Sequence, residues 1–431
     1  MNKQKITLSL AAAVALGLTS NAMAAGFQLA EYSATGLGRA FAGEAAMADN
    51  ASTQFRNPAM LTYLEGTQIS TGAIYVNPNI DVNGTVNSRL SQQPIQTSSK
   101  DFANSAVVPN LYISHQLNDQ LFLGFALSTN YGMETKLSNN FAANQFGNEA
   151  NVKTVEANAN FGYKLNEQLS LGLGVRYAKG KGHFGAQAPN YLPKSGIPDL
   201  HVPPAGTTLA YMEGKDSDWG WQAGAVWQIN PNNRIGLSYK SKMEMNFEGH
   251  AEGFMFNGQK LPGTLSVPLP ATAEIATFHQ INDKLALHTS INWTDWSSFK
   301  SLTAELPIGA TTIKEEHWKD NYRFAVGATY QYTNKLALRS GIAYDMAAVN
   351  DKNRTATIPE TDRTWFSVGA GYQWSENLTF DAGLTYILAK DASIKEPRGY
   401  ESDNAAAQLG TFKGEVSGDI WLAGVQASYK F

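Results

Sequence analysis

The chain contains no cysteine, and only 16% of its 431 residues are charged. Without cysteine it can form neither a disulfide scaffold nor a thiolate metal site. Beyond the first two dozen residues it also lacks any run of about 18 apolar residues, so membrane-spanning helices are excluded. A formal net charge of −4 leaves no basic excess to replace the counterions of nucleic acid, and we expect no nucleic-acid partner.

The first 24 residues have the pattern of an export signal. Lys3 and Lys5 precede a short apolar segment at residues 6–18, and Ala-Met-Ala at residues 22–24 fits the small-x-small rule for cleavage. The apolar segment is too short to span a membrane as a helix. We therefore expect residues 1–24 to be a signal peptide that is removed on export.

The rest of the sequence alternates between apolar and polar residues with a period of two. Trp219, Trp221 and Trp227 share one parity, whereas the other parity holds small and polar residues. Because successive strand side chains point to opposite faces, each such segment has one apolar face. Each is about ten residues long, the length of a tilted transmembrane strand. The clearest further segments are residues 154–165, 169–179, 234–247, 321–332, 336–345, 364–374 and 378–388.

Short polar turns join six pairs of segments, and long connections rich in Gly, Pro and Asn separate the pairs. One more strand at residues 67–77 and another at 419–431 bring the count to about 14, with both ends of the chain on the short-turn side. The six turns are Leu117–Leu121, Leu165–Leu169, Ile229–Ile235, Ile281–Leu285, Tyr332–Leu336 and Trp374–Leu378.

We therefore predict an all-β fold in which residues 66–431 form a transmembrane antiparallel β-barrel of about 14 strands in a bacterial outer membrane. A soluble sandwich or propeller also uses alternating strands and is the alternative. The Trp and Tyr residues at the ends of the apolar faces favour the membrane, because aromatic side chains suit both membrane interfaces.

A barrel of this size is too wide for its wall side chains to fill. Residues 25–65 precede the first strand and show no strand period. They carry more large apolar residues, such as Phe27, Leu37 and Phe41, than a free tail would. We predict that this segment folds into the lumen as a plug, or hatch; a flexible periplasmic tail is the alternative.

At this point several motifs resemble the FadL family of outer-membrane long-chain fatty acid transporters. The resemblance covers essentially the whole chain after the signal. It implies a hatch-plugged barrel, passive uptake of long-chain fatty acids or similar hydrophobic compounds, and lateral exit through a gap in the barrel wall. The motifs are Ala-Gly-Phe-Gln-Leu at 25–29, Ser-Ala-Thr-Gly-Leu-Gly-Arg-Ala at 33–40, Asn-Pro-Ala at 57–59, Lys-Asp-Asn-Tyr-Arg at 319–323 and Ile-Pro-Glu-Thr-Asp-Arg-Thr-Trp at 358–365.

The resemblance also assigns roles to particular residues. Asn57, Pro58 and Ala59 match the hatch signature, which is either a turn that moves to open a passage or a rigid turn that anchors the plug. Ala106 and Thr129 lie where the wall opening of the family is lined. Small side chains there would leave a gap unfilled, although small residues are also ordinary in barrels.

A fatty acid at neutral pH is a carboxylate on a long apolar chain, so its site needs an apolar tunnel and one or two cations. By the resemblance, Lys314 matches a basic residue that binds the ligand headgroup. The second family cation, an arginine just after the fifth strand, is missing here, and Lys181 or His183 is expected to replace it. A solvated charge is the alternative for each of these side chains.

Two connections, residues 182–217 and 248–270, are unusually apolar. Exposed apolar patches mark interaction sites, and the resemblance implies a low-affinity groove between the corresponding loops. We expect a landing groove for amphipathic substrates; packing of the two loops on each other over the barrel mouth is the plainer interpretation. The groove residues that we expect are Tyr191, Leu192, Ile197, Leu200, Phe254, Met255, Phe256 and Leu261.

No catalytic constellation is visible. The seven histidines form no His-Glu-x-x-His motif, and no phosphate-binding Gly-Lys-Ser/Thr run occurs. We expect no metal, no cofactor and no enzymatic activity; a general porin, an aromatic-hydrocarbon porin and an outer-membrane lipase or protease are the alternatives. The expected partners are a long-chain fatty acid or other hydrophobic small molecule, the outer-membrane lipids, and phage or host surfaces that reach the long loops.

Overall fold

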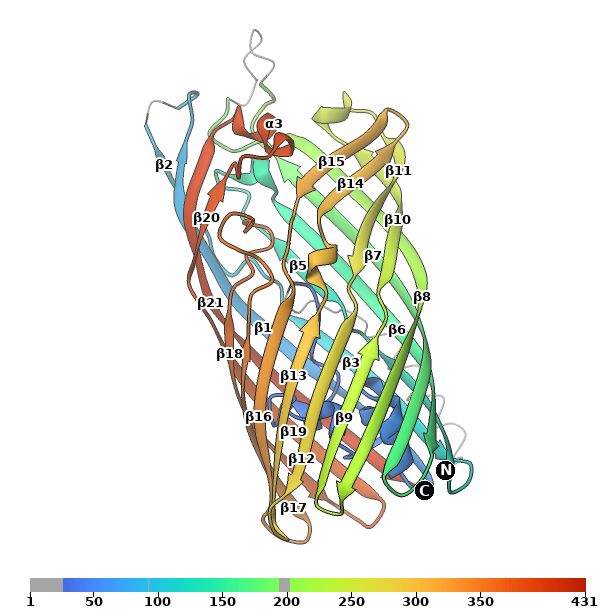
Figure 1. Cartoon of the computed structure of the whole chain (residues 1–431). Coiled ribbons are helices and arrows are strands. Elements are labelled where there is room, and N and C mark those ends of the chain that lie inside the picture. Colours follow the sequence, from blue (N-terminus) through green and yellow to red (C-terminus); the bar gives the residue numbers. More distant parts are fainter. Residues whose placement is uncertain (1–25, 92, 194–201) are drawn as a thin grey trace, which may run out of the picture.

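The computed structural model describes residues 26–91, 93–193 and 202–431. In it, 14 strands form a closed antiparallel barrel (Figure 1), which confirms the predicted fold class. Each strand pairs with the next, and the last pairs back to the first from Gln68–Lys430 to Asn87–Thr411. In ring order they are β1 (Thr67–Asn87), β3 (Ala106–Gln116), β4 (Leu121–Ser128), β6 (Glu149–Lys164), β7 (Leu169–Gln187), β8 (Thr208–Asn230), β9 (Asn233–Lys240), β12 (Thr272–Gln280), β13 (Leu285–Thr294), β16 (Asn321–Gln331), β17 (Leu336–Asp345), β18 (Arg363–Gln373), β19 (Leu378–Ala389) and β21 (Thr411–Lys430).

All six predicted turns join neighbouring strands at one end of the barrel, where the C-terminus also lies (Figure 1). Their asparagines close the turns with side-chain hydrogen bonds. Asn118 Oδ1 accepts from the backbone N–H of Gln120 and Leu121, both at 2.9 Å, and Asn166 and Asn282 do the same in their own turns. An Asx turn of this kind supplies the local hydrogen bonds that a two-strand reversal needs. We call the opposite end the long-loop end.

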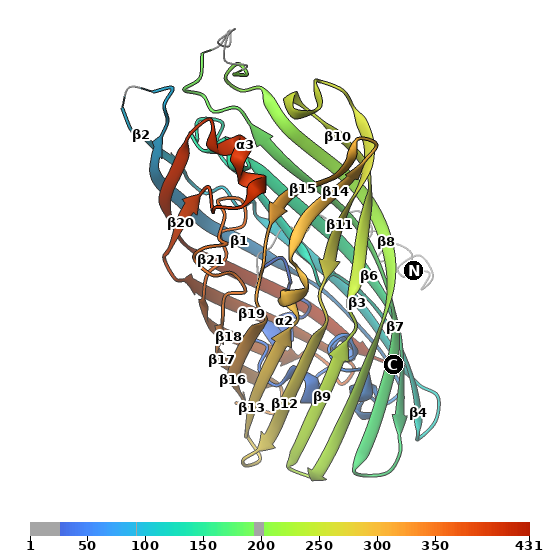
Figure 2. The ribbon, with the colours of Figure 1, turned by 45° about the horizontal axis from the view of Figure 1, so that its top comes forward.

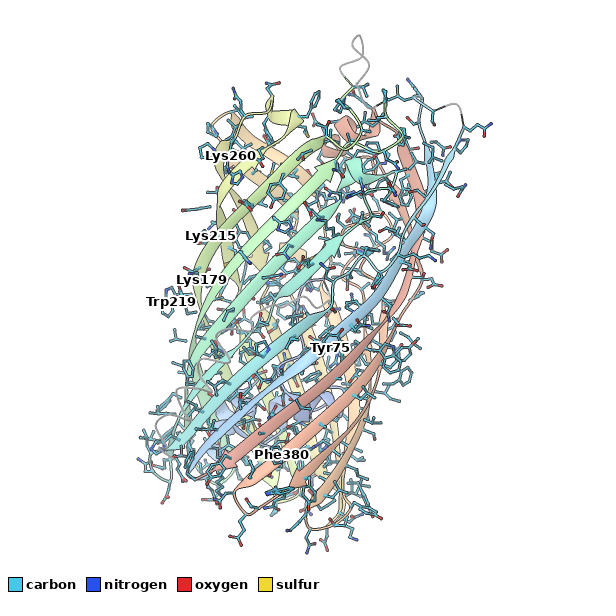
Figure 3. All side chains as sticks on the ribbon, turned by 180° about the vertical axis from the view of Figure 1, so that it is seen from behind. Tyr75, Lys179, Lys215, Trp219, Lys260 and Phe380 are labelled. Atoms are coloured by element: carbon cyan, nitrogen blue, oxygen red, sulfur yellow. The ribbon has the colours of Figure 1, made fainter. Side chains whose placement is uncertain are left out.

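The outer face of the barrel is apolar over most of its height. Leu173 and Val175 of β7 are 61% and 52% exposed, whereas their inward neighbours are buried. Figure 3 shows labelled Tyr75, Trp219 and Phe380 on this outer surface. A soluble sheet would cover such a face with a core, so the alternation here matches a lipid-facing wall and excludes the sandwich.

Additional short strands extend the wall at the long-loop end (Figures 1 and 2). They correct two expectations, because residues 248–270 form a hairpin of two strands and the 182–217 connection contains strand at both ends. Beyond the membrane the outer face no longer has to be apolar, so the alternation fades while the backbone pairing continues. These strands are β2 (Ile95–Ser99), β5 (Gly132–Lys136), β10 (Met243–Glu252), β11 (Leu261–Leu269), β14 (Ser301–Leu306), β15 (Gly309–Glu315) and β20 (Ala392–Glu396).

The predicted strand at residues 234–247 is in fact two strands, β9 and β10, that separate at Ser241 and Lys242. Lys240 and Ser241 are both buried although they are adjacent, so the alternation shifts by one residue at this point. A one-residue shift moves every later side chain to the other face. An unbroken alternation from residue 234 to 247 would have placed Glu244 in the lumen, but after the shift Glu244 is exposed and pairs with Lys242 at 2.8 Å.

The N-terminal segment, residues 26–64, lies inside the barrel near its middle and lower half (blue in Figures 1 and 2). It folds as α2 (Ala34–Leu37) and the 3₁₀ turns η1 (Glu44–Ala46), η2 (Ala51–Phe55) and η3 (Pro58–Tyr63). Ser33, Asn50 and Asn57 cap three of these turns with their side-chain oxygens. Within the described ranges no helix is long and apolar enough to cross a membrane.

Wall glycines allow the backbone of this segment to touch the barrel. A Cβ added at Gly341 of β17 would lie 2.1 Å from the Arg39 carbonyl oxygen, and one at Gly172 of β7 would lie 2.2 Å from the Ala59 nitrogen. Such separations are far below van der Waals contact, so any side chain there would push the segment away from the wall. Arg39 itself is 1% exposed and pairs with Glu44 at 2.7 Å and Asp49 at 2.6 Å.

We expect Gly341→Val to lower the free energy of unfolding by about 1–3 kcal/mol, the usual cost of overpacking, and to admit larger solutes through the barrel. Urea unfolding in detergent micelles and solute permeability in liposomes would measure the two effects. Ile342→Leu, on the lipid-facing side of the same strand, is the control and should change neither. A Gly341→Val protein as stable and as tight as the original would show that the segment is not packed against β17.

Candidate functional site

Two adjoining cavities lie at the long-loop end, above the N-terminal segment. Including open solvent, the outer cavity has a volume of about 1610 Å³ and the inner one about 510 Å³. Phe184 and Lys314 line both cavities, so these two residues mark their junction. The remaining inner lining is mostly apolar and includes Phe27, Met133, Val152, Phe247, Val267, Phe299, Leu302 and Ile358.

The aromatic end of the inner cavity depends on the first described residues of the chain. The Phe27 ring packs edge-on against Trp296 at 4.7 Å and lies 6.2 Å from both Trp318 and Tyr131. A Cβ on Gly26 would lie 2.5 Å from the Trp318 ring, and Gly26 has φ +63°, so glycine is required there. The N-terminal segment thus contributes directly to the cavity wall.

Lys314 is the cation at the junction. It belongs to β15, and its side chain is buried between the two cavities. Its ammonium donates to the Phe146 carbonyl oxygen at 3.3 Å and to Thr357 Oγ1 at 3.2 Å, and it lies 4.0 Å from Glu396 Oε1. Burial lowers the pKa of Lys314, and Glu396 opposes that shift. An ammonium between two apolar cavities is an arrangement that suits a carboxylate on a long chain.

The structure does not bring Lys181 to Lys314. On β7 the even residues Gly180, Gly182 and Phe184 face the lumen, so Lys181 faces outward, directly opposite Lys215 of β8, which Figure 3 labels on the outer surface. The assignment of Lys181 to the headgroup is therefore corrected, because the strand continues past the point where a loop was expected.

His183 shares the outward parity of Lys181. It borders the inner cavity, but its ring stacks on Tyr211 of β8 at a centroid distance of 5.7 Å. Burial lowers the pKa of His183, which disfavours the charged form that a headgroup would need.

A second cation near Lys314 is Arg398, which the sequence analysis missed. It is buried just after β20 and donates to the Glu315 carbonyl oxygen at 2.6 Å, and it pairs with Asp403 at 3.1 Å. Its position follows from a loop that folds back onto β15, a long-range contact without a local sequence signal. Because Asp403 already balances its charge, Arg398 supports the site without offering a free cation.

The expected groove residues are only partly brought together. Phe254, Met255 and Phe256 line the outer cavity, and the first two are 45% and 54% exposed. Leu261 packs against the cluster around Phe256 without lining the cavity. The cavity is completed by further apolar residues, namely Val202, Leu209, Met212, Ile313 and Leu409.

The other expected groove residues have different places. Leu192 is buried in the core, and the half-buried Tyr191 hydrogen-bonds through its hydroxyl to the Leu409 carbonyl oxygen. Neither lines the outer cavity. Ile197 and Leu200 lie outside the described residues, as does the predicted signal peptide.

Ala106 and Thr129 flank an interruption in the barrel wall. The last ladder pair of β3 and β4 is Leu111–Leu127, and pairing between the two sides resumes only at Ala103–Thr135. In between, the chain bends inward and bonds to the N-terminal segment instead: Leu29 N–H donates to the Asn130 carbonyl at 2.7 Å, and Gly132 N–H to the Phe27 carbonyl at 2.8 Å. We call this interruption, between residues 106–110 and 129–133, the wall gap.

A buried polar network holds the inward bend in place. Asn130 Nδ2 donates to Glu156 Oε2 at 2.7 Å, and Glu156 forms an ion pair with Arg176 at the same distance. Lys240 donates to Asn130 Oδ1 at 3.1 Å and lies 4.0 Å from the centre of the Phe55 ring in the N-terminal segment. These side chains link the wall, the bend and the segment, so the interior charges are paired structurally.

Asn57, Pro58 and Ala59 form a capped turn that touches the wall. Asn57 Oδ1 accepts from the Ala59 N–H at 3.0 Å, while its amide donates to the carbonyl oxygens of Ala45 at 2.6 Å and Ala225 at 3.3 Å. Pro58 takes the first position of η3, where no N–H is needed. The φ of Asn57 is −140°, an ordinary extended value without strain.

Among the residues that the structure describes, no group of three or more acidic or histidine side chains is arranged to bind a metal ion. The lining of the two cavities is mostly apolar, and the buried charged groups gather around Lys314. Chemically, this arrangement can bind an amphiphile.

Comparison with known proteins agrees with this geometry. A family model described as outer membrane protein transport protein (OMPP1/FadL/TodX) matches residues 15–431. A long-chain fatty acid transport protein of Escherichia coli O6:H1 is 34% identical, with 98% of each chain covered. Outer membrane protein P1 of Haemophilus influenzae is 37% identical over 84% of this chain and 85% of its own.

Solved structures share the fold. A Pseudomonas aeruginosa FadL homologue superposes with a TM-score of 0.83 at 23% identity, covering 94% of this chain and all of the other. The Pseudomonas putida toluene transporter TodX gives a TM-score of 0.68 at 17% identity, with 93% and 99% covered. The chain is thus a bacterial outer-membrane transport channel and belongs to the OMPP1/FadL/TodX family.

Proposed function

We propose that this channel takes up long-chain fatty acids or closely similar amphiphiles passively, and that it performs no chemistry on them. The observation that carries the proposal is the buried ammonium of Lys314 at the junction of two apolar cavities. A hydrocarbon needs no cation, whereas a fatty acid brings a carboxylate that must be paired once it leaves water. Relatives whose names specify long-chain fatty acid transport support the same substrate.

The first step is capture at the outer cavity. Its exposed residues Phe254 and Met255 offer an apolar surface on the outside of the cell, next to water. An amphiphile that lays its chain on this surface removes apolar area from water, which favours binding without demanding a close fit. We therefore assign the expected groove to the outer cavity, which is lined by three of the predicted groove residues, Phe254, Met255 and Phe256.

The second step is transfer into the inner cavity. Its lining is mostly apolar, so it suits the hydrocarbon chain of an amphiphile. The chain would lie among Phe247, Val267 and Leu302, with the headgroup at Lys314.

The third step is exit through the wall gap into the membrane. The N-terminal segment acts as a hatch that blocks the straight path to the periplasm, because its residues Arg39, Phe41 and Phe55 are buried against the wall. The wall gap lies beside the inner cavity. Tyr131 and Met133 border the wall gap, and Met133 also lines the inner cavity. Asn57 ties the hatch to β8, which favours an anchored plug with movement confined to its first residues.

A general porin is disfavoured by the N-terminal segment that lies in the lumen (Figure 1), and an enzyme by relatives whose names describe transport. Contact with outer-membrane lipids follows from the exposed apolar wall. The hairpins β10–β11 and β14–β15 lie at the long-loop end (Figure 2), and they are among the parts that phage or host surfaces would touch.

Lys314→Met should lower laurate affinity about 10- to 100-fold, the range expected for a charge-assisted hydrogen bond of roughly 1.5–3 kcal/mol. Affinity for 1-dodecanol should fall by less than about twofold, because its headgroup is neutral. Calorimetric titration in micelles would measure both. Lys260→Met, an exposed lysine near the outer rim (Figure 3), is the matched control. Equal losses for both ligands would refute the headgroup role.

Ala106→Phe should fill the wall gap and lower laurate uptake about tenfold, as a barrier about 1.4 kcal/mol higher would do, while laurate binding stays unchanged. Uptake by cells that lack their own fatty acid channel and binding to the purified protein are the two measurements. Val107→Phe points to the lipid from the same strand and serves as control. Undiminished uptake by the Ala106→Phe variant would place the exit elsewhere.

A further inference from the structure

The proposed headgroup site around Lys314 holds more carboxyl groups than a site that only binds a carboxylate would need. Around Lys314 lie Glu316, Glu396, Arg398 and Asp403, all of them buried. Three carboxyl groups thus face two cations. Such a cluster must be balanced by pairing or by protonation, since an unpaired buried charge is costly.

The pairing is unequal. The charge of Arg398 is paired with Asp403. The Arg398 Nη2 lies 3.1 Å from Asp403 Oδ1, and the Arg398 backbone N–H donates to Asp403 Oδ2 at 2.6 Å. Lys314 therefore remains as the cation for Glu316 and Glu396. Glu316 Oε2 is already occupied by the indole N–H of Trp318 at 2.9 Å, and this residue lines the inner cavity.

Glu396, unlike Glu316, lies on the side of the outer cavity. It lines the outer cavity together with Lys314, and its Oε1 lies 4.0 Å from the Lys314 ammonium. Its Oε2 is buried and has no hydrogen-bond partner among the residues that the structure describes. The side chain thus presents a carboxyl group to Lys314 from the side on which a substrate would arrive, where the substrate's own carboxylate has to bind.

Two carboxylates cannot share one buried ammonium without strong mutual repulsion. Burial raises the pKa of Glu396 to about 7, with Lys314 and Arg398 opposing the rise and Asp403 adding to it. Near neutral pH this group can therefore take up or release a proton at small cost. The other groups that face the Lys314 ammonium are Glu316, Arg398 and Asp403.

We propose that Glu396 is a specificity-determining residue that competes with the substrate carboxylate for Lys314, so that a fatty acid binds as its carboxylate together with one proton that Glu396 takes from solvent. A neutral amphiphile of the same length binds without that proton. The inference rests on the proposed function and adds to it a coupling between headgroup charge and pH.

The sign of the pH dependence follows. As pH rises through about 7, Glu396 loses its proton, and the site holds an anion where the substrate carboxylate must bind. Carboxylate affinity therefore falls with rising pH, while affinity for an alcohol does not change. The folded protein keeps the Glu396 proton above the ordinary glutamate pKa of 4.5, so this group's contribution to stability is also lost as pH rises from that value to about 7.

The test is calorimetric titration of laurate and 1-dodecanol at pH 8, each in two buffers of different ionisation enthalpy. The original protein should take up about one proton per laurate and none per dodecanol. Glu396→Gln should bind laurate about tenfold more tightly at pH 8, with proton uptake near zero, because the competing charge is gone. Glu401→Gln, which removes a nearby exposed carboxylate, should behave as the original.

Laurate binding to the original protein without proton uptake would overturn the proposal, and this measurement needs no variant. Unaltered laurate affinity and proton uptake in a folded Glu396→Gln protein would overturn it as well. If neither laurate nor dodecanol binds the original protein at all, the proposed function fails first. Tighter laurate binding by the Glu396→Gln protein, with dodecanol binding unaffected, would support both the proposed function and the role of Glu396.

Discussion

The structure depends on one constraint: in hydrocarbon, every backbone N–H and C=O must find a partner inside the protein. The barrel meets it by closing, since β21 pairs with β1 along nearly the full length of both strands. The wall gap interrupts the ladder of strand hydrogen bonds, yet its backbone groups still find partners inside the protein. Where β4 leaves β3, residues Asn130 and Gly132 exchange the lost ladder bonds for bonds to Leu29 and Phe27. On the other side of the gap, Pro109 has no N–H to satisfy, and Thr71 donates its hydroxyl to the Asn110 carbonyl.

The N-terminal segment therefore completes the wall as well as filling the lumen. Its contact with the barrel is backbone on backbone at wall glycines such as Gly172 and Gly341, which leaves little room between the two. The same segment supplies Phe27 to the inner cavity and Phe55 to the Lys240 ammonium beside the inward bend. Cavity, bend and plug are consequently parts of one packed unit, and a shift in the first residues of the segment would be felt at both the cavity and the gap.

The charged side chains in the interior differ in how closely they are paired. The interior ion pairs, such as Glu156–Arg176 and Arg339–Asp381, are each about 2.7 Å long and hold wall strands to one another. Around Lys314 the balance is looser, because the closest carboxylate lies 4.0 Å away. A cation that is incompletely matched inside an apolar cavity is energetically expensive for the fold, and under the proposed function it is the group that pairs with an incoming carboxylate.

The sequence alone determined the barrel. Period-two alternation, six Asn-rich turns and the apolar parity fix strand number, orientation and lipid-facing side, because these are local properties of a strand between two solvents. Lys314 and the residues 254–256 were also predicted from the sequence, through a family resemblance and an apolar run, and the structure places them at the two cavities.

Tertiary structure decided the rest. The shift at Ser241, which turned Glu244 outward, and the continuation of β7 past Lys181 depend on which strands pair beyond the membrane, where no apolar face is required. Glu396, the last residue of β20, and Arg398, in the loop after it, reach Lys314 only because this part of the chain packs onto β15. The gap at Ala106 exists because residues 130–132 bond to a segment that precedes them by a hundred positions. Contacts of that kind arise from the packing of distant segments, and no local pattern of residues records them.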